Sequence, residues 1–226
     1  MALVPLIKAC QAANRTLIMK YGMNYPKMKW LLILIIAALI FTWIQQQNNF
    51  SEALYYNTYG DSLSIETIDN MISVAKKYSW SVYLVTPVML LLRICFTSLL
   101  FYIALYFRDI KSNFGSCFNI AIKADTAFLF VGLLNIIYFT FVPIETLADI
   151  MTPFSLAYFI DMTSIPPYII YPLGLINLGE IIYWILLVIM VRYQYKMSIS
   201  DSLWFIVSSY GVGLLLLSLT IALIVI

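Results

Sequence analysis

Four polar side chains interrupt apolar stretches of this chain, and they are its best candidates for chemistry. Arg93 lies near the middle of the segment WSVYLVTPVMLLLRICFTSLLFYIALYFR. Asn135 lies in a second apolar segment, and Asn177 and Glu180 lie three residues apart in a third. Polar groups at membrane depth commonly mark ion or substrate paths, and they also hold helices together through hydrogen bonds. The candidate site therefore consists of Arg93, Glu180, Asn177 and Asn135.

Arg93 and Glu180 are predicted to form an ion pair. Arg93 follows Trp80 by 13 residues and Glu180 follows Tyr168 by 12, so at 1.5 Å per residue both lie about 18–20 Å from one membrane boundary. An unpaired charge at the bilayer centre is costly, and opposite charges at one level offset that cost. In the alternative, Arg93 extends towards the cytoplasm and a protonated Glu180 bonds to Asn177.

The residue types argue against an enzyme. The chain has no histidine, which is the commonest metal ligand and general base. Its cysteines are scattered without CxxC spacing, at positions Cys10, Cys95 and Cys117. We therefore expect no catalytic residue, no metal site and no cofactor. The net charge of +2, without a basic stripe, also argues against a nucleic-acid partner.

Hydropathy defines the fold class. The chain is 63% hydrophobic and 11% charged, whereas a soluble domain is about 25% charged. About 20 apolar residues span a bilayer. The sequence predicts an all-α integral membrane protein, a bundle of five transmembrane helices over 30–226. Its expected spans are 30–44, 80–107, 126–142, 168–191 and 203–226.

The segments between the spans carry their own signals. Residues 1–29 form a cytoplasmic N-terminal segment, in which apolar residues at helical spacing predict an amphipathic interfacial helix. A short amphipathic helix is predicted in the polar stretch 45–79, at Ile65–Ala75. Asp125 and Asp201 are expected to cap the third and fifth spans. Ser209 and Gly213 have the small-xxx-small spacing that permits close helix approach.

The distribution of lysine and arginine predicts the orientation. The N-terminal segment, the 108–125 connection and the 192–202 turn together hold ten of these residues, and the two alternate loops hold Lys76 and Lys77 only. Positive residues accumulate on the cytoplasmic side. We therefore expect a cytoplasmic N-terminus and an external C-terminus.

Over roughly residues 80–226 the chain resembles the bacterial branch of the Ypt-interacting-protein (YIP) family of five-span membrane proteins. The resemblance rests on the proline-containing span with Pro87, and on a Gly-Ser-Cys-Phe element, Gly115 to Phe118, before the third span. It implies a non-enzymatic scaffold or interaction partner in the bilayer, in a bacterial inner membrane. Its partners would be membrane lipids and other membrane proteins, or further copies of the chain. The alternative is a transporter or permease component that uses the polar residues between its helices.

Overall fold

Five long apolar helices dominate the molecule. The computed structural model describes residues 27–49, 51–144, 147, 149, 154–159 and 172–225, whose regular structure is helical apart from an isolated bridge between Ser155 and Asn177. The candidate membrane spans are Met28–Gln47, Ser81–Phe107, Phe114–Phe141, Leu178–Tyr195 and Ile199–Ile224. The all-α, multi-span prediction is confirmed. The amphipathic helix expected in residues 1–29 lies mostly outside the described residues, and the helix that begins at Lys27 is itself a candidate span.

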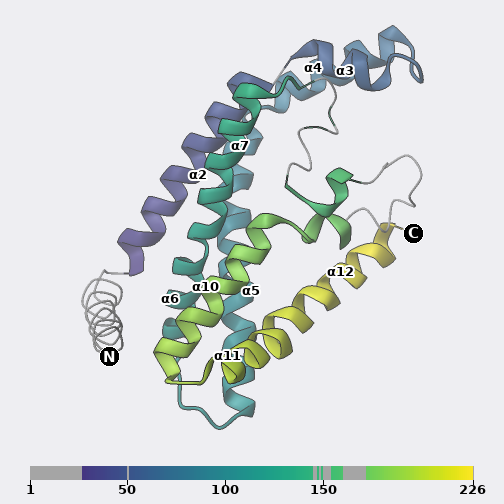
Figure 1. Cartoon of the computed structure of the whole chain (residues 1–226). Coiled ribbons are helices and arrows are strands. Elements are labelled where there is room, and N and C mark those ends of the chain that lie inside the picture. Colours follow the sequence, from purple (N-terminus) through teal and green to yellow (C-terminus); the bar gives the residue numbers. More distant parts are fainter. Residues whose placement is uncertain are drawn as a thin grey trace, which may run out of the picture.

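Successive spans run in opposite directions (Figure 1). Helix α2, Lys27–Asn49, leads to the hairpin of α3, Glu52–Tyr59, and α4, Ile65–Tyr78, which lies across one end of the bundle. Helix α5, Ser81–Phe107, returns to the other end. With 23 residues, α2 is about 34 Å long at 1.5 Å per residue. It is therefore longer than the predicted 30–44 and does not fall short of a bilayer.

The amphipathic helix predicted near Ile65–Ala75 is present as α4. Ser64 caps it by accepting a hydrogen bond from the Thr67 backbone N–H, and Ile68 and Ile72 are buried. Tyr56 of α3 donates a hydrogen bond to the Asp69 carboxylate, which raises the pKa of the Tyr56 phenol above its ordinary value. A second link between the two helices is an exposed ion pair of Glu52 with Lys76, a residue of α4. The hairpin thus has an apolar and a charged face.

The third span differs from its prediction. It consists of α6, Phe114–Ala124, and α7, Thr126–Phe141, joined at Asp125. Much of the 108–125 segment, expected to be a connection between spans, is therefore helix. Five of the 11 residues of α6 are buried: Cys117, Ile120, Ala121, Ile122 and Ala124. Asn113 caps α6 by accepting a hydrogen bond from the Ser116 backbone N–H at 2.8 Å. The predicted cap of this span at Asp125 is wrong, because that side chain makes no capping hydrogen bond.

The fourth and fifth spans also begin elsewhere than predicted. Helix α10, Leu178–Tyr195, starts after Asn177, which is its N-cap. The fifth span comprises α11, Ile199–Ile206, the π-helical turn η3, Val207–Gly211, and α12, Val212–Val225. Its N-cap is Ser198, whose hydroxyl oxygen accepts from the Asp201 backbone N–H at 3.0 Å. Asp201 instead lies in the first turn and accepts a bond from the Ser198 hydroxyl.

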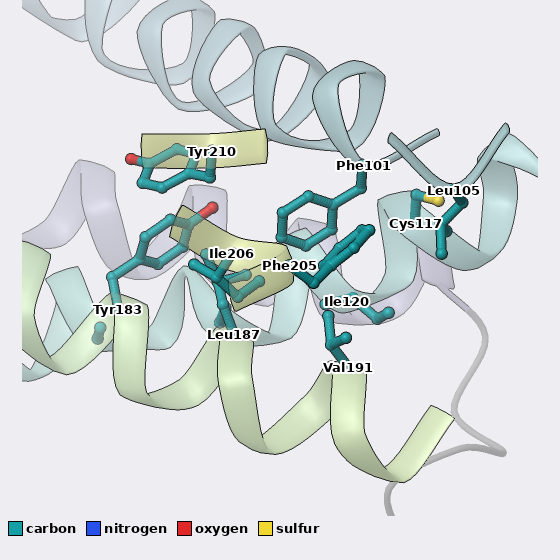
Figure 2. Packing of buried hydrophobic residues seen from close by; sticks show 12 residues of the cluster. Phe101, Leu105, Cys117, Ile120, Tyr183, Leu187, Val191, Phe205, Ile206 and Tyr210 are labelled. Carbon is teal, nitrogen blue, oxygen red and sulfur yellow. The ribbon is translucent and has the colours of Figure 1, made fainter. Parts of the chain in front are cut away.

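The main core lies where α5, α6, α10 and α11 meet. Figure 2 shows Tyr183, Leu187 and Val191 projecting from α10 towards Phe205 and Ile206 of α11. Phe101 of α5 packs on Phe205 with ring centroids 5.3 Å apart. Because α6 contributes to this cluster and to a second one with α2 and α5, it is the central helix of the bundle. By contrast, α12 diverges from the other spans (Figure 1).

Candidate functional site

Arg93 of α5 forms a two-pronged ion pair with Asp125. Its Nε donates to Oδ1 and its Nη2 to Oδ2 of the carboxylate, both at 2.8 Å. The Asp125 side chain is 1% exposed and that of Arg93 is 32% exposed. The guanidinium carbon lies 3.6 Å from the centroid of the Phe128 ring, in cation–π geometry. The planar fork of arginine suits such a carboxylate better than the ammonium of lysine would.

This pair corrects the prediction that Arg93 binds Glu180. Asp125 follows Phe114 by 11 residues and Arg93 precedes Phe107 by 14. At 1.5 Å per residue, both therefore lie about 16–21 Å from the same end of the bundle. The sequence does contain a sign that Asp125 lies inside a span. The run 114–124 before it is largely apolar, and it forms the first part of the third span.

Glu180 has a different partner. The Tyr210 hydroxyl donates to its carboxylate, with distances of 3.3 Å to Oε1 and 3.2 Å to Oε2. Tyr210 belongs to η3, and a π-helical turn changes the register of the side chains around a helix. The fully buried Tyr183 donates in turn to the Thr97 hydroxyl at 2.9 Å. The sequence did not predict a role for these tyrosines, because tyrosine is common in apolar segments and nothing in the pattern distinguishes these two.

A run of aromatic rings lies between the Arg93–Asp125 pair and Glu180. Phe128, which stacks on Arg93, lies 5.2 Å from the Tyr183 ring, and Tyr183 lies 5.4 Å from the Tyr210 ring. Neither Arg93 nor Glu180 forms an ion pair with the other among the described residues. Arg93 and Glu180 therefore have separate partners, as the sequence-based alternative required, but the partners are Asp125 and Tyr210 and differ from those that the alternative named.

The two asparagines have separate environments. The Asn177 side chain accepts from the Glu180 backbone N–H at 2.9 Å, and its amide donates to the Gly174 carbonyl oxygen at 2.9 Å. Asn177 therefore caps the start of α10. The alternative to the ion pair required a bond from Asn177 to the Glu180 carboxylate, and the structure shows a bond to the Glu180 backbone N–H in its place. Asn135 lies in α7, where its Oδ1 atom is buried without a hydrogen-bond partner in the described part of the chain.

A cleft of about 190 Å³ opens beside the ion pair. Its walls come from α2, α5 and α7, and Arg93 and Asp125 line it together with Phe128. The remaining lining residues are Ala38, Phe41, Thr42, Gln45, Leu90, Leu129 and Gly132. The deepest charged groups of the second and third spans are thus next to a space between helices.

The chain matches no family model, no curated protein and no solved structure in the comparisons made. The class of protein therefore rests on the structure itself. Among the described residues, five helices have the length and apolar composition needed to cross a membrane, and Arg93 and Asp125, the deepest charges of the second and third spans, meet between helices. The chain is a multi-pass integral membrane protein.

Proposed function

We propose that this chain is a non-enzymatic scaffold or interaction partner in the bilayer. The observation that carries the proposal is that its deep charges are bound within the chain. Arg93 holds Asp125 with two hydrogen bonds, and Glu180 accepts from Tyr210. Internal pairs of this kind fix the packing of helices, and they leave the outer faces of the spans for lipid or for other membrane proteins.

The outer faces offer a large apolar surface for such contacts. On α2 the exposed residues include Leu32, Ile33, Ile36 and Ile40, and on α12 they include Leu215, Leu216, Leu219 and Leu223. Helices that meet in a membrane associate through packing and interhelical hydrogen bonds. These faces would therefore meet lipid, a partner protein or a second copy of the chain.

The resemblance to the YIP family belongs to this proposal and is supported only by the five-span pattern. The Gly115–Phe118 element lies in the first turns of α6, where Cys117 is fully buried. Its place in the fold is structural, between α5 and α10, and no contact to a ligand is needed to account for it.

The proposed orientation puts the N-terminus in the cytoplasm of a bacterium and the C-terminus outside. The 108–113 connection and the turn at Lys196 lie at one end of the bundle, and the α3–α4 hairpin, towards which α2 runs, lies at the other (Figure 1). This alternation agrees with the lysine and arginine distribution. A reporter fused within the Gly60–Ser64 turn should be active outside the cytoplasm, and cytoplasmic activity there would reverse the orientation.

Chemical crosslinking in intact membranes, followed by purification in mild detergent, tests the scaffold proposal. We expect a defined partner, or a defined oligomer of this chain, to be captured through α2 or α12. Substituting Ile36 by Trp on α2 should reduce capture if that face is used, and Val85→Trp on the exposed face of α5 is the control. A chain that remains monomeric and unpartnered in the membrane would contradict the proposal.

A transporter or permease component is the second candidate, and the cleft beside Arg93 favours it. Polar groups facing a space between helices are the usual elements of a substrate path. Substrate-dependent flux into proteoliposomes that is lost in Arg93→Gln would support this candidate over the scaffold. Absence of flux across a panel of ions and small metabolites would leave the scaffold as the better explanation.

A further inference from the structure

The cleft beside Arg93 has the form of a binding site. Four of its lining residues lie on one stripe of α2 at helical spacing: Ala38, Phe41, Thr42 and Gln45. The stripe from Ala38 to Gln45 is about 10 Å long at 1.5 Å per residue. Thr42 donates to the Ala38 carbonyl oxygen at 2.9 Å and lies 3.3 Å from the Thr86 hydroxyl of α5. The cleft therefore runs from Arg93 towards the end of the bundle that carries the α3–α4 hairpin.

Arg93 presents unused hydrogen-bond donors beside this space. An arginine has five N–H groups, and Asp125 accepts one from Nε and one from Nη2. The other three N–H groups have no acceptor among the described residues. The exposed part of the side chain, about one third, lines the cleft. A donor left without an acceptor in a low-dielectric setting is costly. The cleft thus favours an occupant with acceptor oxygens.

The charge of the site selects a neutral occupant. Arg93 and Asp125 together carry no net charge, so a phosphate or carboxylate would bring an uncompensated negative charge to this depth. The aromatic walls at Phe41 and Phe128 and the aliphatic walls at Leu90 and Leu129 suit an apolar body. The occupant that fits is uncharged, soluble in the bilayer, and bears a carbonyl oxygen.

One further polar group, the Gln45 amide, lies towards the outer end of the site. The Gln45 amide lines the cleft and has no hydrogen-bond partner in the described part of the chain. Asn135 does not line the cleft, but it follows the lining residue Gly132 by one turn of α7, and its Oδ1 is buried and unbonded among the described residues. An occupant about 10 Å long has hydrogen-bonding groups near both of its ends.

We propose that the cleft between α2, α5 and α7 binds the carbonyl-bearing head of a neutral lipid, with Arg93 donating to the carbonyl oxygen. An ester carbonyl of diacylglycerol and a ring carbonyl of a benzoquinone share this chemistry. The site holds one molecule, because its volume of about 190 Å³ accommodates one such head and not the acyl or alkyl chain, which extends into the surrounding bilayer.

Native mass spectrometry of the full chain in mild detergent tests the proposal, because it resolves individual bound lipids. The protein is titrated separately with dioleoylglycerol, with a decyl-substituted 1,4-benzoquinone and with phosphatidylglycerol as the anionic probe. We expect one neutral probe to bind in a 1:1 ratio more tightly than phosphatidylglycerol, and the probe that binds identifies the lipid class. Failure of both neutral probes to bind, or tighter binding of the anionic one, overturns the proposal.

Ala38→Phe fills the cleft from α2 and should weaken binding of the neutral probe by about tenfold or more. Ile40→Phe is the matched control, since the same new side chain on the same helix replaces a residue that is 51% exposed. Equal loss in both variants overturns the assignment of the site. If Ala38→Phe fails to fold, Gln45→Leu decides, because it removes an amide near the end of α2 with little change in volume. Its affinity should fall by about threefold or more, and an unchanged affinity overturns the proposal.

Discussion

Arg93 and Asp125 meet at the junction of α6 and α7, where two hydrogen bonds of 2.8 Å join a guanidinium to a carboxylate that is 1% exposed. The two residues are 32 positions apart in the chain. Their contact fastens α5 to the third span at the centre of the bundle. The main predictions concern this pair and the tyrosine-bound Glu180.

Removal of either partner should be strongly destabilising. Arg93→Ala or Asp125→Ala leaves one buried charge unpaired, which typically costs about 3–5 kcal/mol. We expect a large loss of folded, monodisperse protein, measured by size exclusion of a fluorescent fusion and by thermal unfolding in detergent. A loss no greater than that of Leu99→Ala, on the exposed face of α5, would contradict a structural role for the pair.

A charge exchange distinguishes the two possible partners of Arg93. The double variant Arg93→Asp with Asp125→Arg should recover part of the folded yield lost in each single variant, because the pair interaction is restored. Arg93→Glu with Glu180→Arg should show no such recovery. Recovery in the second pair and not in the first would restore the sequence-based prediction.

Tyr210→Phe should destabilise the protein by about 1–3 kcal/mol, because the half-buried Glu180 carboxylate loses the hydrogen bond from the Tyr210 hydroxyl. The phenyl ring still fills the position beside Tyr183 and Trp184, so the change tests the hydroxyl alone. Thermal unfolding measures the effect, and Tyr106→Phe, at a residue that is 74% exposed, is the control. Equal stability of the two variants would show that Glu180 does not depend on this bond.

Gly179→Ala should weaken the docking of α10 on the third span. An added Cβ would lie 3.0 Å from the Phe128 ring and 3.0 Å from Oδ1 of the capping Asn177. Overpacking of this kind costs about 1–3 kcal/mol. Gly174→Ala is the matched control, since no atom lies within 4 Å of its added Cβ. A thermal unfolding temperature lowered equally by both substitutions would argue against a tight contact at Gly179.

Asn177→Ala should cost about 0.5–2 kcal/mol, the usual effect of removing an N-cap side chain. Asn177→Asp should recover part of the loss, because an aspartate oxygen can accept the same bond from the Glu180 N–H but cannot donate to the Gly174 carbonyl oxygen. Amide hydrogen exchange at Leu178–Ile181 reports the fraying of the first turn. Protection that is unchanged in Asn177→Ala would mean that tertiary contacts alone hold the start of α10.

The sequence by itself determined the class of protein and the number of spans. Long apolar runs have no favourable alternative to crossing a bilayer as helices, because each backbone N–H and C=O must be bonded within the helix. The amphipathic helix α4 was likewise readable, since its apolar residues recur with helical spacing. These features depend on local composition, and local composition is visible in a single chain.

Only the tertiary structure decided which polar groups meet. Depth along a helix can be estimated from the number of residues, but rotation about its axis and the choice of neighbouring helix depend on packing of the whole bundle. The sequence predicted Asp125 to be a cap at the boundary of a span. It is the partner of Arg93 because α6 packs at the centre of the bundle and does not lie outside the membrane. Tyr210 reached Glu180 through a π-helical turn that composition does not reveal.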